Sequence, residues 1–290
     1  MKSIFNPIRG ITTFLFIVCN VILHAVILTP FALIKCLLPR NQFIIDIIDL
    51  IAESWITTNN IFYKLTRNLD IRTTGLEGLS KKEWYVCIAN HQSWVDILVI
   101  QIALNRKIPL LKFFLKKELI YIPIIGLAWW VLDFPFMSRY SKKIIEKKPK
   151  LEGKDIKTTK KLCERFRKKP IAILNFVEGT RYTEAKYLKQ KSPFRNLLKP
   201  KSAGLAFALK ALDGKIQKIL NLTIKYEEAT SFWNFLCGDI KKVIIDIETI
   251  PVTEKLIGNY GQDLDFKNQF REEISKLWQS KDDKLDSIKI

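Results

Sequence analysis

The chain has 290 residues, nearly half of them apolar, which is enough for one large domain or two small ones with a sizeable core. This composition excludes a disordered chain, apart from the tail. The formal net charge of +19 indicates an acidic partner: an anionic membrane, an anionic substrate or nucleic acid. The five cysteines are scattered without a C-x-x-C pair, so neither a disulfide framework nor a thiolate zinc site is indicated.

A long apolar run near the N-terminus, residues 11–34, contains no Lys, Arg, Asp or Glu. A helix needs about 20 residues to cross the hydrocarbon core of a bilayer, so this run predicts a retained membrane anchor. A signal peptide and a buried core helix are the alternatives, although no small-x-small cleavage site follows the run. His24 lies inside it, and we expect a buried, hydrogen-bonded ring there.

Residues 43–65 have a different pattern, with apolar side chains recurring every three or four positions and acids on the other face. This period predicts an amphipathic helix, broken near residues 57–60, that lies on the membrane or packs on the anchor. Residues 71–79 contain two glycines and read as a short strand and a turn.

Strand-like and helix-like segments alternate through the rest of the chain. Strands are expected at residues 84–89, 108–114, 171–177, 215–226 and 242–250, and helices at residues 97–104, 155–168 and 202–212. The apolar, aromatic run 124–137 suits either a core or a bilayer interface. One charged helix, residues 266–278, precedes a tail that we expect to be frayed.

This alternation predicts an α/β fold: a central mixed sheet flanked by helices, with an N-terminal membrane-embedded helical segment. We divide the chain into a membrane anchor and amphipathic helical segment (1–70), a central domain (71–252) and a C-terminal charged helix and tail (253–290).

A histidine and an acid lie five positions apart where one strand ends and a helix begins. Residues 90–96 read N-H-Q-S-W-V-D, so His91 follows the strand and Asp96 falls in the first helical turn. From there the Asp96 carboxylate can fold back to the imidazole and fix its tautomer. A neutral, oriented imidazole is a natural general base near pH 7. An H-x4-D pair alone is weakly specific, since such spacings arise often by chance.

A second strand, 171–177, ends in the polar residues Glu178, Gly179, Thr180 and Arg181. The carboxyl ends of strands in an open α/β sheet gather at one edge, so the two loops are expected to meet in one site. The Arg181 guanidinium matches a phosphate, and Gly179 allows close approach of a ligand. Glu178 either accepts a hydrogen bond from a substrate hydroxyl or pairs with Arg181.

With two further cations, Arg139 and Lys116 (or its neighbour Lys117), the site would suit a phosphate monoester beside a reacting hydroxyl. The alternatives for the site are weaker. No G-x-S-x-G sequence surrounds Ser93, which argues against a serine nucleophile. The other histidine lies in the apolar anchor, so no metal site is expected.

The two motifs together, N-H-x4-D and then F-V-E-G-T-R, resemble the glycerolipid acyltransferases of the 1-acylglycerol-3-phosphate acyltransferase type. The resemblance covers residues 83–225, and the sequence after the second motif resembles the bacterial branch of that family. It implies a membrane-bound enzyme that transfers a fatty acyl chain from acyl-CoA or acyl carrier protein to the free hydroxyl of a lysophospholipid. The acceptor that it favours is 1-acylglycerol-3-phosphate, which would give phosphatidic acid.

Carried over by the resemblance, His91 is the general base and Asp96 orients it. Arg139 ends a block, residues 136–139, that matches a phosphate-binding block of the family, and residues 178–181 match the block that binds the glycerol phosphate. A fourth block of the family usually contains a proline in an apolar strand. Here the proline is missing and Asn221 stands near its place, so the resemblance does not determine the acceptor or the acyl pocket.

The resemblance implies no cofactor beyond the thioester co-substrate, anionic membrane lipids as partners, and no nucleic acid. The expected location is the inner (cytoplasmic) membrane of a bacterium, with the catalytic domain on the cytoplasmic side. Three alternatives stay open: an acyltransferase for another lysophospholipid, a membrane-bound hydrolase, and a non-enzymatic basic protein that binds anionic lipid or nucleic acid. The last rests on the lysine-rich segment 139–169.

Overall fold

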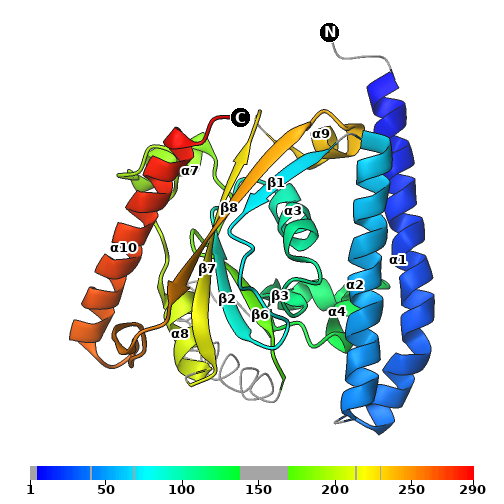
Figure 1. Cartoon of the computed structure of the whole chain (residues 1–290), viewed down its shortest axis with the longest axis horizontal. Coiled ribbons are helices and arrows are strands. Elements are labelled where there is room, and N and C mark those ends of the chain that lie inside the picture. Colours follow the sequence, from blue (N-terminus) through cyan, green and yellow to red (C-terminus); the bar gives the residue numbers. More distant parts are fainter. Residues whose placement is uncertain (1–4, 40, 68, 138–168, 213, 229) are drawn as a thin grey trace, which may run out of the picture.

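The structure, a computed structural model, describes residues 5–290 except 40, 68, 138–168, 213 and 229. A mixed six-stranded sheet lies between helices on both faces (Figure 1), as the sequence predicts. Its strands are β1 (Asp70–Thr74), β2 (Trp84–Ala89), β3 (Leu111–Phe113), β6 (Ala172–Phe176), β7 (Ile216–Tyr226) and β8 (Lys242–Pro251). A separate two-stranded ladder pairs β4 (Leu115–Lys116) with β5 (Phe136–Met137).

The strand order in the main sheet is β1-β8-β7-β2-β6-β3. β7, β2, β6 and β3 run parallel to one another, and β8 is antiparallel to β7. The central strand β2 is buried along almost its whole length because it pairs with β6 on one side and β7 on the other.

The two faces of the sheet bury two separate clusters of apolar side chains, because successive residues of a strand point to opposite faces. Tyr85 and Cys87 of β2 belong to one cluster, and Val86 and Ile88 belong to the other. The first face is covered by α3 (Val95–Leu104), the end of α2 (Gln42–Arg67) and α9 (Phe232–Cys237). The second is covered by α8 (Ala203–Ala211) and α10 (Leu264–Ser287). Figure 1 shows these two layers on either side of the strands.

The N-terminal helices α1 (Phe5–Leu37) and α2 pack side by side as a long hairpin (Figure 1). Polar side chains fix the pair: Asn20 donates to the Asn59 Oδ1 atom at 2.9 Å, and His24 Nε2 lies 3.0 Å from the Ser54 hydroxyl. The prediction of a buried, hydrogen-bonded His24 is confirmed. The predicted break in the second helix is wrong, because α2 continues through residues 57–60, where Thr57 and Thr58 hydroxyls bond back to carbonyls four residues earlier.

Within the described residues, α1 is the one helix long and apolar enough to cross a membrane, judged by its length and composition. Much of its apolar surface is exposed: the outward-facing residues include Ile8, Ile11, Phe14, Leu15, Leu23, Val26 and Leu33. On the inner side, α2 acids pair with lysines of the central domain, Lys81 with Glu53 at 2.5 Å and Lys169 with Asp49 at 2.7 Å.

The C-terminal tail differs from the expectation of fraying, because α10 continues to Ser287. Lys281, Asp282 and Leu285 of its last turns are buried. The Asp282 carboxylate accepts from the backbone N–H groups of Arg195 and Asn196 at 2.7 and 2.8 Å, which holds the helix end against the preceding loop.

Short connecting elements complete the described chain: η1 (Lys117–Tyr121), α4 (Ile125–Val131), α7 (Glu184–Gln190) and η3 (Glu254–Leu256). None of these four elements is predicted from the sequence, and the same holds for α9. The helix predicted at residues 155–168 lies outside the described residues. The three-part division of the chain stays a prediction.

Candidate functional site

Two polar loops meet where β2 and β6 end: the first, or histidine loop, comprises residues 90–94, and the second comprises residues 177–183. Ala89 of β2 and Phe176 of β6 are paired in register, so His91 and Glu178 each follow their strand by two residues on neighbouring strands. The backbone N–H of Tyr182 donates to the His91 carbonyl at 2.7 Å, which ties the second loop to the first. The sequence-based expectation that these loops adjoin is met by this geometry.

His91 and Asp96 form the predicted contact, with 2.8 Å between Nδ1 and Oδ2. α3 begins at Val95, so Asp96 lies in its first turn and folds back across the loop. The same Oδ2 atom accepts from the backbone N–H groups of Gln92 and Ser93 at 2.6 and 2.9 Å. Asp96 is fully buried, while 14% of the His91 side chain is exposed. The pair therefore has a fixed acid and a reachable imidazole edge.

The imidazole is held from a second direction by an aromatic ring. The Phe176 ring stacks on it with centroids 3.9 Å apart and planes 16° from parallel. With Nδ1 directed at Asp96, Nε2 is the ring nitrogen left for a substrate hydroxyl. This arrangement suits a general base.

β7 contributes to the first loop as well. The Asn90 side chain donates to the Ile224 carbonyl and accepts from the Ile224 N–H, both at 2.9 Å. Two residues farther along the strand, the Tyr226 hydroxyl donates to Asp96 Oδ1 at 2.6 Å. Asp96 is thus bonded through both of its oxygens.

Glu178 lies beneath the second loop and is almost fully buried. Its two carboxyl oxygens face the backbone N–H groups of His91 at 3.2 Å and Leu198 at 3.4 Å. Burial, with a smaller contribution from Asp96, raises the pKa of Glu178 to about 8, against the opposing effects of the two N–H donors and Lys281. The carboxyl therefore carries little negative charge at pH 7, which leaves the surface above it suited to an anion.

The alternative of a salt bridge between Glu178 and Arg181 is wrong in this geometry. Glu178 points inward to backbone groups, whereas Arg181 is exposed and lies over the ring of Trp94, 5.1 Å from the guanidinium carbon to the ring centroid. A guanidinium on an aromatic face keeps its N–H groups directed at solvent. Arg181 is therefore available to an anionic ligand.

Lysines surround the same loop. Lys186 Nζ donates to the Thr180 hydroxyl and the Arg181 carbonyl at 2.9 and 2.8 Å. Gly179 has φ +69°, and a Cβ atom added there would lie 3.0 Å from the Lys201 side chain. The glycine thus permits both a left-handed turn and the close passage of a lysine. We call Arg181, Lys186 and Lys201 the basic rim; of the three, Arg181 lies over Trp94 of the histidine loop.

The other two cations predicted for the site are Lys116 and Arg139. Lys116 is exposed in β4, and no hydrogen bond or ion pair joins it to either loop among the described residues. Arg139 lies outside the described residues, so its phosphate-binding role stays a prediction. No group of three or more His, Cys, Asp or Glu side chains that could hold a metal occurs in the described part of the chain.

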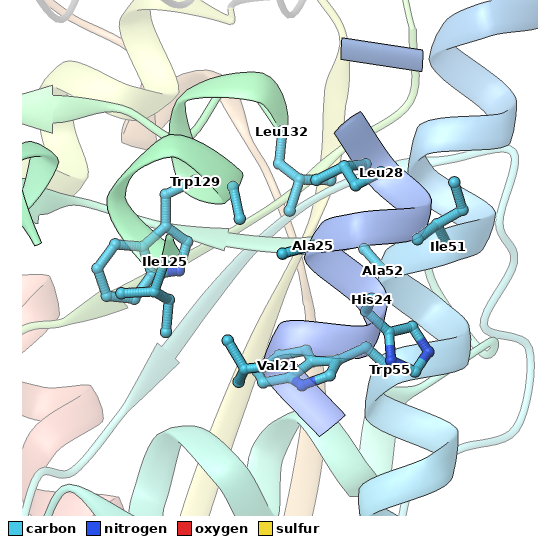
Figure 2. Close-up of a pocket in the computed structure, with 11 residues that line it drawn as sticks. Val21, His24, Ala25, Leu28, Ile51, Ala52, Trp55, Ile125, Trp129 and Leu132 are labelled. Carbon is cyan, nitrogen blue, oxygen red and sulfur yellow. The ribbon is translucent and has the colours of Figure 1, made fainter. Parts of the chain in front are cut away.

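An apolar pocket of about 60 Å³ lies between α1, α2 and α4 (Figure 2). Figure 2 shows His24 and Trp55 among its lining side chains, with Trp129 opposite them on α4. The pocket belongs to the helical layer, and its lining includes no residue of the two polar loops.

Sequence reasoning missed several residues of the site. Phe176 of β6 and Tyr226 of β7 contact the His91–Asp96 pair. Asn90 ties the loop to Ile224 of β7, and Trp94 lies against Arg181. The N-H-x4-D pattern contains Asn90 and Trp94, and the basic stretch after Arg181 contains Lys186 and Lys201. Tyr226 had no such signal, because its contact depends on the pairing of β7 with β2.

Comparisons with known proteins identify the family of the chain. The Acyltransferase family matches residues 70–218. A 2-acyl-1-lysophosphatidylinositol acyltransferase of Saccharomyces cerevisiae is 28% identical over 247 residues, covering 68% of this chain and 59% of that protein. The human 1-acyl-sn-glycerol-3-phosphate acyltransferase gamma is 28% identical over 222 residues, covering 69% and 52%. The chain therefore spans little more than half the length of these relatives.

A solved structure shares the whole fold. The crystal structure of the 1-acyl-sn-glycerophosphate acyltransferase PlsC from Thermotoga maritima matches with a TM-score of 0.58 and 18% identity, covering 98% of this chain and 99% of that one. At this identity the likeness shows the fold.

Proposed function

Because the chain belongs to the Acyltransferase family, we propose that it transfers a fatty acyl chain from a thioester donor to the free hydroxyl of a lysophospholipid. The observation that carries this proposal is the His91–Asp96 contact at 2.8 Å, at the rim of a basic loop. A base next to an anion-binding surface suits an acceptor that carries a hydroxyl and a phosphate.

The proposed reaction is a direct transfer. His91 Nε2 takes the proton of the acceptor hydroxyl, and the oxygen attacks the thioester carbonyl carbon. The C–O ester bond forms, the C–S bond breaks, and the proton passes to the leaving thiolate. Asp96 stabilises the imidazolium between these two proton transfers, and a positioned base contributes roughly 10²–10⁴-fold to a rate.

The basic rim holds the acceptor phosphate in this proposal. Arg181 has an exposed guanidinium, which matches phosphate oxygens in a two-point geometry. The Thr180 hydroxyl and Gly179 backbone lie in the same turn. Glu178 acts beneath them as a brace for the loop, and Arg139 would join from its own block. Fixing the phosphate places the hydroxyl at His91, and such positioning is a large part of the rate.

The donor and the location are further parts of the proposal. The proposed donor is acyl-CoA or acyl carrier protein, with no cofactor or metal. The exposed apolar face of α1 supports attachment to a membrane of anionic lipids, and the net charge of +19 agrees with it. We place the enzyme at the cytoplasmic side of a bacterial inner membrane, where its thioester donors are made.

The most favoured acceptor is 1-acylglycerol-3-phosphate, which would give phosphatidic acid. A lysophospholipid with a larger headgroup is the second candidate, because the yeast relative is named for lysophosphatidylinositol. The resemblance leaves the acceptor undetermined because residues 220–224 lack the family's proline; in this stretch, the Asn221 side chain donates to Glu248 at 2.9 Å.

An acceptor screen tests the proposal. The purified chain in detergent is given lysophosphatidic acid or other lysophospholipids, each with acyl-CoA and with acyl carrier protein as donor. Diacyl product with lysophosphatidic acid is the expected result. Hydrolysis of the thioester without any acylated lipid would contradict the transferase and favour the hydrolase.

A further inference from the structure

We propose that Tyr226 is a positioning residue for the His91–Asp96 pair, and that its hydroxyl sets the orientation and charge distribution of the Asp96 carboxylate. The catalytic consequence of this inference rests on the proposed function. Its structural part, the effect of Tyr226 on the His91 imidazole, is measurable without any turnover.

Tyr226 bonds a different oxygen of Asp96 from the other hydrogen-bond donors. Oδ2 accepts three of them, from His91 Nδ1 and from the Gln92 and Ser93 N–H groups. Oδ1 accepts from the Tyr226 hydroxyl at 2.6 Å. Since Asp96 is fully buried, water does not reach Oδ1 to replace this donor.

The pairing of β7 with the histidine loop places Tyr226 beside Asp96. Asn90 bonds both backbone groups of Ile224, which fixes β7 against the histidine loop. Tyr226 follows two residues later and therefore points to the same face of the sheet as Ile224. Burial, reinforced by the Asp96 charge and the hydrogen bond to it, raises the pKa of Tyr226 well above its usual value, so the hydroxyl remains a donor.

Removing the hydroxyl has a predictable electrostatic effect. When a carboxylate loses one hydrogen-bond donor, its negative charge is less stabilised and interacts more strongly with the donors that remain. The groups around the imidazole are Asp96 of α3, Tyr226 of β7 and Glu178 of the β6–α7 loop, with Lys281 of α10 acting on Glu178. With Tyr226 gone, Asp96 attracts the imidazolium proton more strongly. The base then becomes deprotonated only at higher pH.

A second buried tyrosine provides a matched control. The Tyr85 hydroxyl also donates to a carboxylate, Glu83, at 2.7 Å, and Tyr85 lies in the same apolar cluster as Tyr226. Tyr85→Phe removes the same atom from β2 without touching the histidine loop. Effects of losing a buried hydroxyl in general appear in both variants, whereas effects on the pair appear only in Tyr226→Phe.

Two readouts test the inference in detergent-solubilised full chain. In the acyl-transfer assay at neutral pH, Tyr226→Phe should lower kcat about tenfold or more, because Asp96 loses the bond that orients it and more of the base is protonated. The acceptor KM should change less than about twofold, and the acid limb of the pH–rate profile should move to higher pH. By ¹⁵N-histidine NMR, which reports only two imidazoles, the His91 titration should move the same way, and the His24 signal should not.

The outcomes separate the two proposals. An unchanged His91 titration in Tyr226→Phe overturns the inference, whether or not the chain transfers acyl groups. Equal losses in Tyr226→Phe and Tyr85→Phe, or a Tyr226→Phe chain that does not fold beside a folded Tyr85→Phe, also overturn it. A moved titration in a chain without acyltransferase activity supports the inference and contradicts the proposed function.

Discussion

Replacing Asp96 by asparagine removes one negative charge from the site and leaves the shape of the side chain. The asparagine carbonyl can occupy the Oδ2 position and still accept from the backbone N–H groups of Gln92 and Ser93. Its amide nitrogen then faces the Tyr226 hydroxyl, whose oxygen can accept. The loop should therefore keep its conformation, with a cost to folding of about 1 kcal/mol.

The catalytic cost follows from the charge on the pair. Opposite charges about 4 Å apart near a protein surface attract by about 4 kcal/mol, which is close to a factor of 10³ in rate. The imidazolium charge is only partly developed when the hydroxyl proton is in transfer, so the expected loss of kcat/KM is about 10²–10³-fold.

Asp282 offers a matched control, since it is a buried carboxylate that accepts from two backbone N–H groups outside the site. Initial rates of diacyl-lipid formation are measured for both asparagine variants at saturating donor, and thermal unfolding is followed in parallel. Asp282→Asn should lose stability and keep its rate within about threefold. An Asp96→Asn enzyme within about threefold of the wild type would refute the role of this charge.

Two other predictions concern the basic rim and the buried end of α10. Arg181→Met should raise the KM for lysophosphatidic acid by about 10-fold or more, with less effect on acceptors whose phosphate carries a headgroup. An equal rise in KM for the two classes of acceptor would contradict a contact between Arg181 and the phosphate. Burial lowers the pKa of Lys281 to about 7, so its contribution to stability is present at high pH and is lost as the pH falls toward 7. Lys281→Met should therefore destabilise the chain more at pH 9.5 than at pH 7 in denaturant titrations, whereas Lys276→Met, on the exposed side of the same helix, should show no such trend.

Much of the fold was readable from the sequence because periodicity and burial agree. Strand β6 and helix α8 lie close to their predicted bounds, since a short apolar run and a three-to-four repeat leave few alternatives. The break expected in α2 is absent because threonine hydroxyls bond within the helix and its apolar face packs on α1. The end of α10 was underestimated because buried Lys281 and Asp282 look like exposed charges in the sequence.

The site was predictable where its residues are close in the chain. Asp96 reaches His91 through one helical turn, so spacing alone suggests the contact. Tyr226 reaches the same carboxylate across the sheet, and this depends on strand order and register, which the sequence does not specify. Glu178 was expected at the substrate, but its buried place against two backbone N–H groups became evident only from the packing of the loops.

The two histidines of the chain allow a direct measurement of the proposed base. His91→Gln and His24→Gln each remove one imidazole, the first beside Asp96 and the second beside Ser54 in the helical hairpin. Acyl transfer to lysophosphatidic acid is compared for the two variants at equal folded concentration. We predict that His91→Gln loses about 10²-fold or more of its turnover while His24→Gln keeps most of it. A His91→Gln chain that still transfers acyl groups at the wild-type rate would contradict the assignment of His91 as the base.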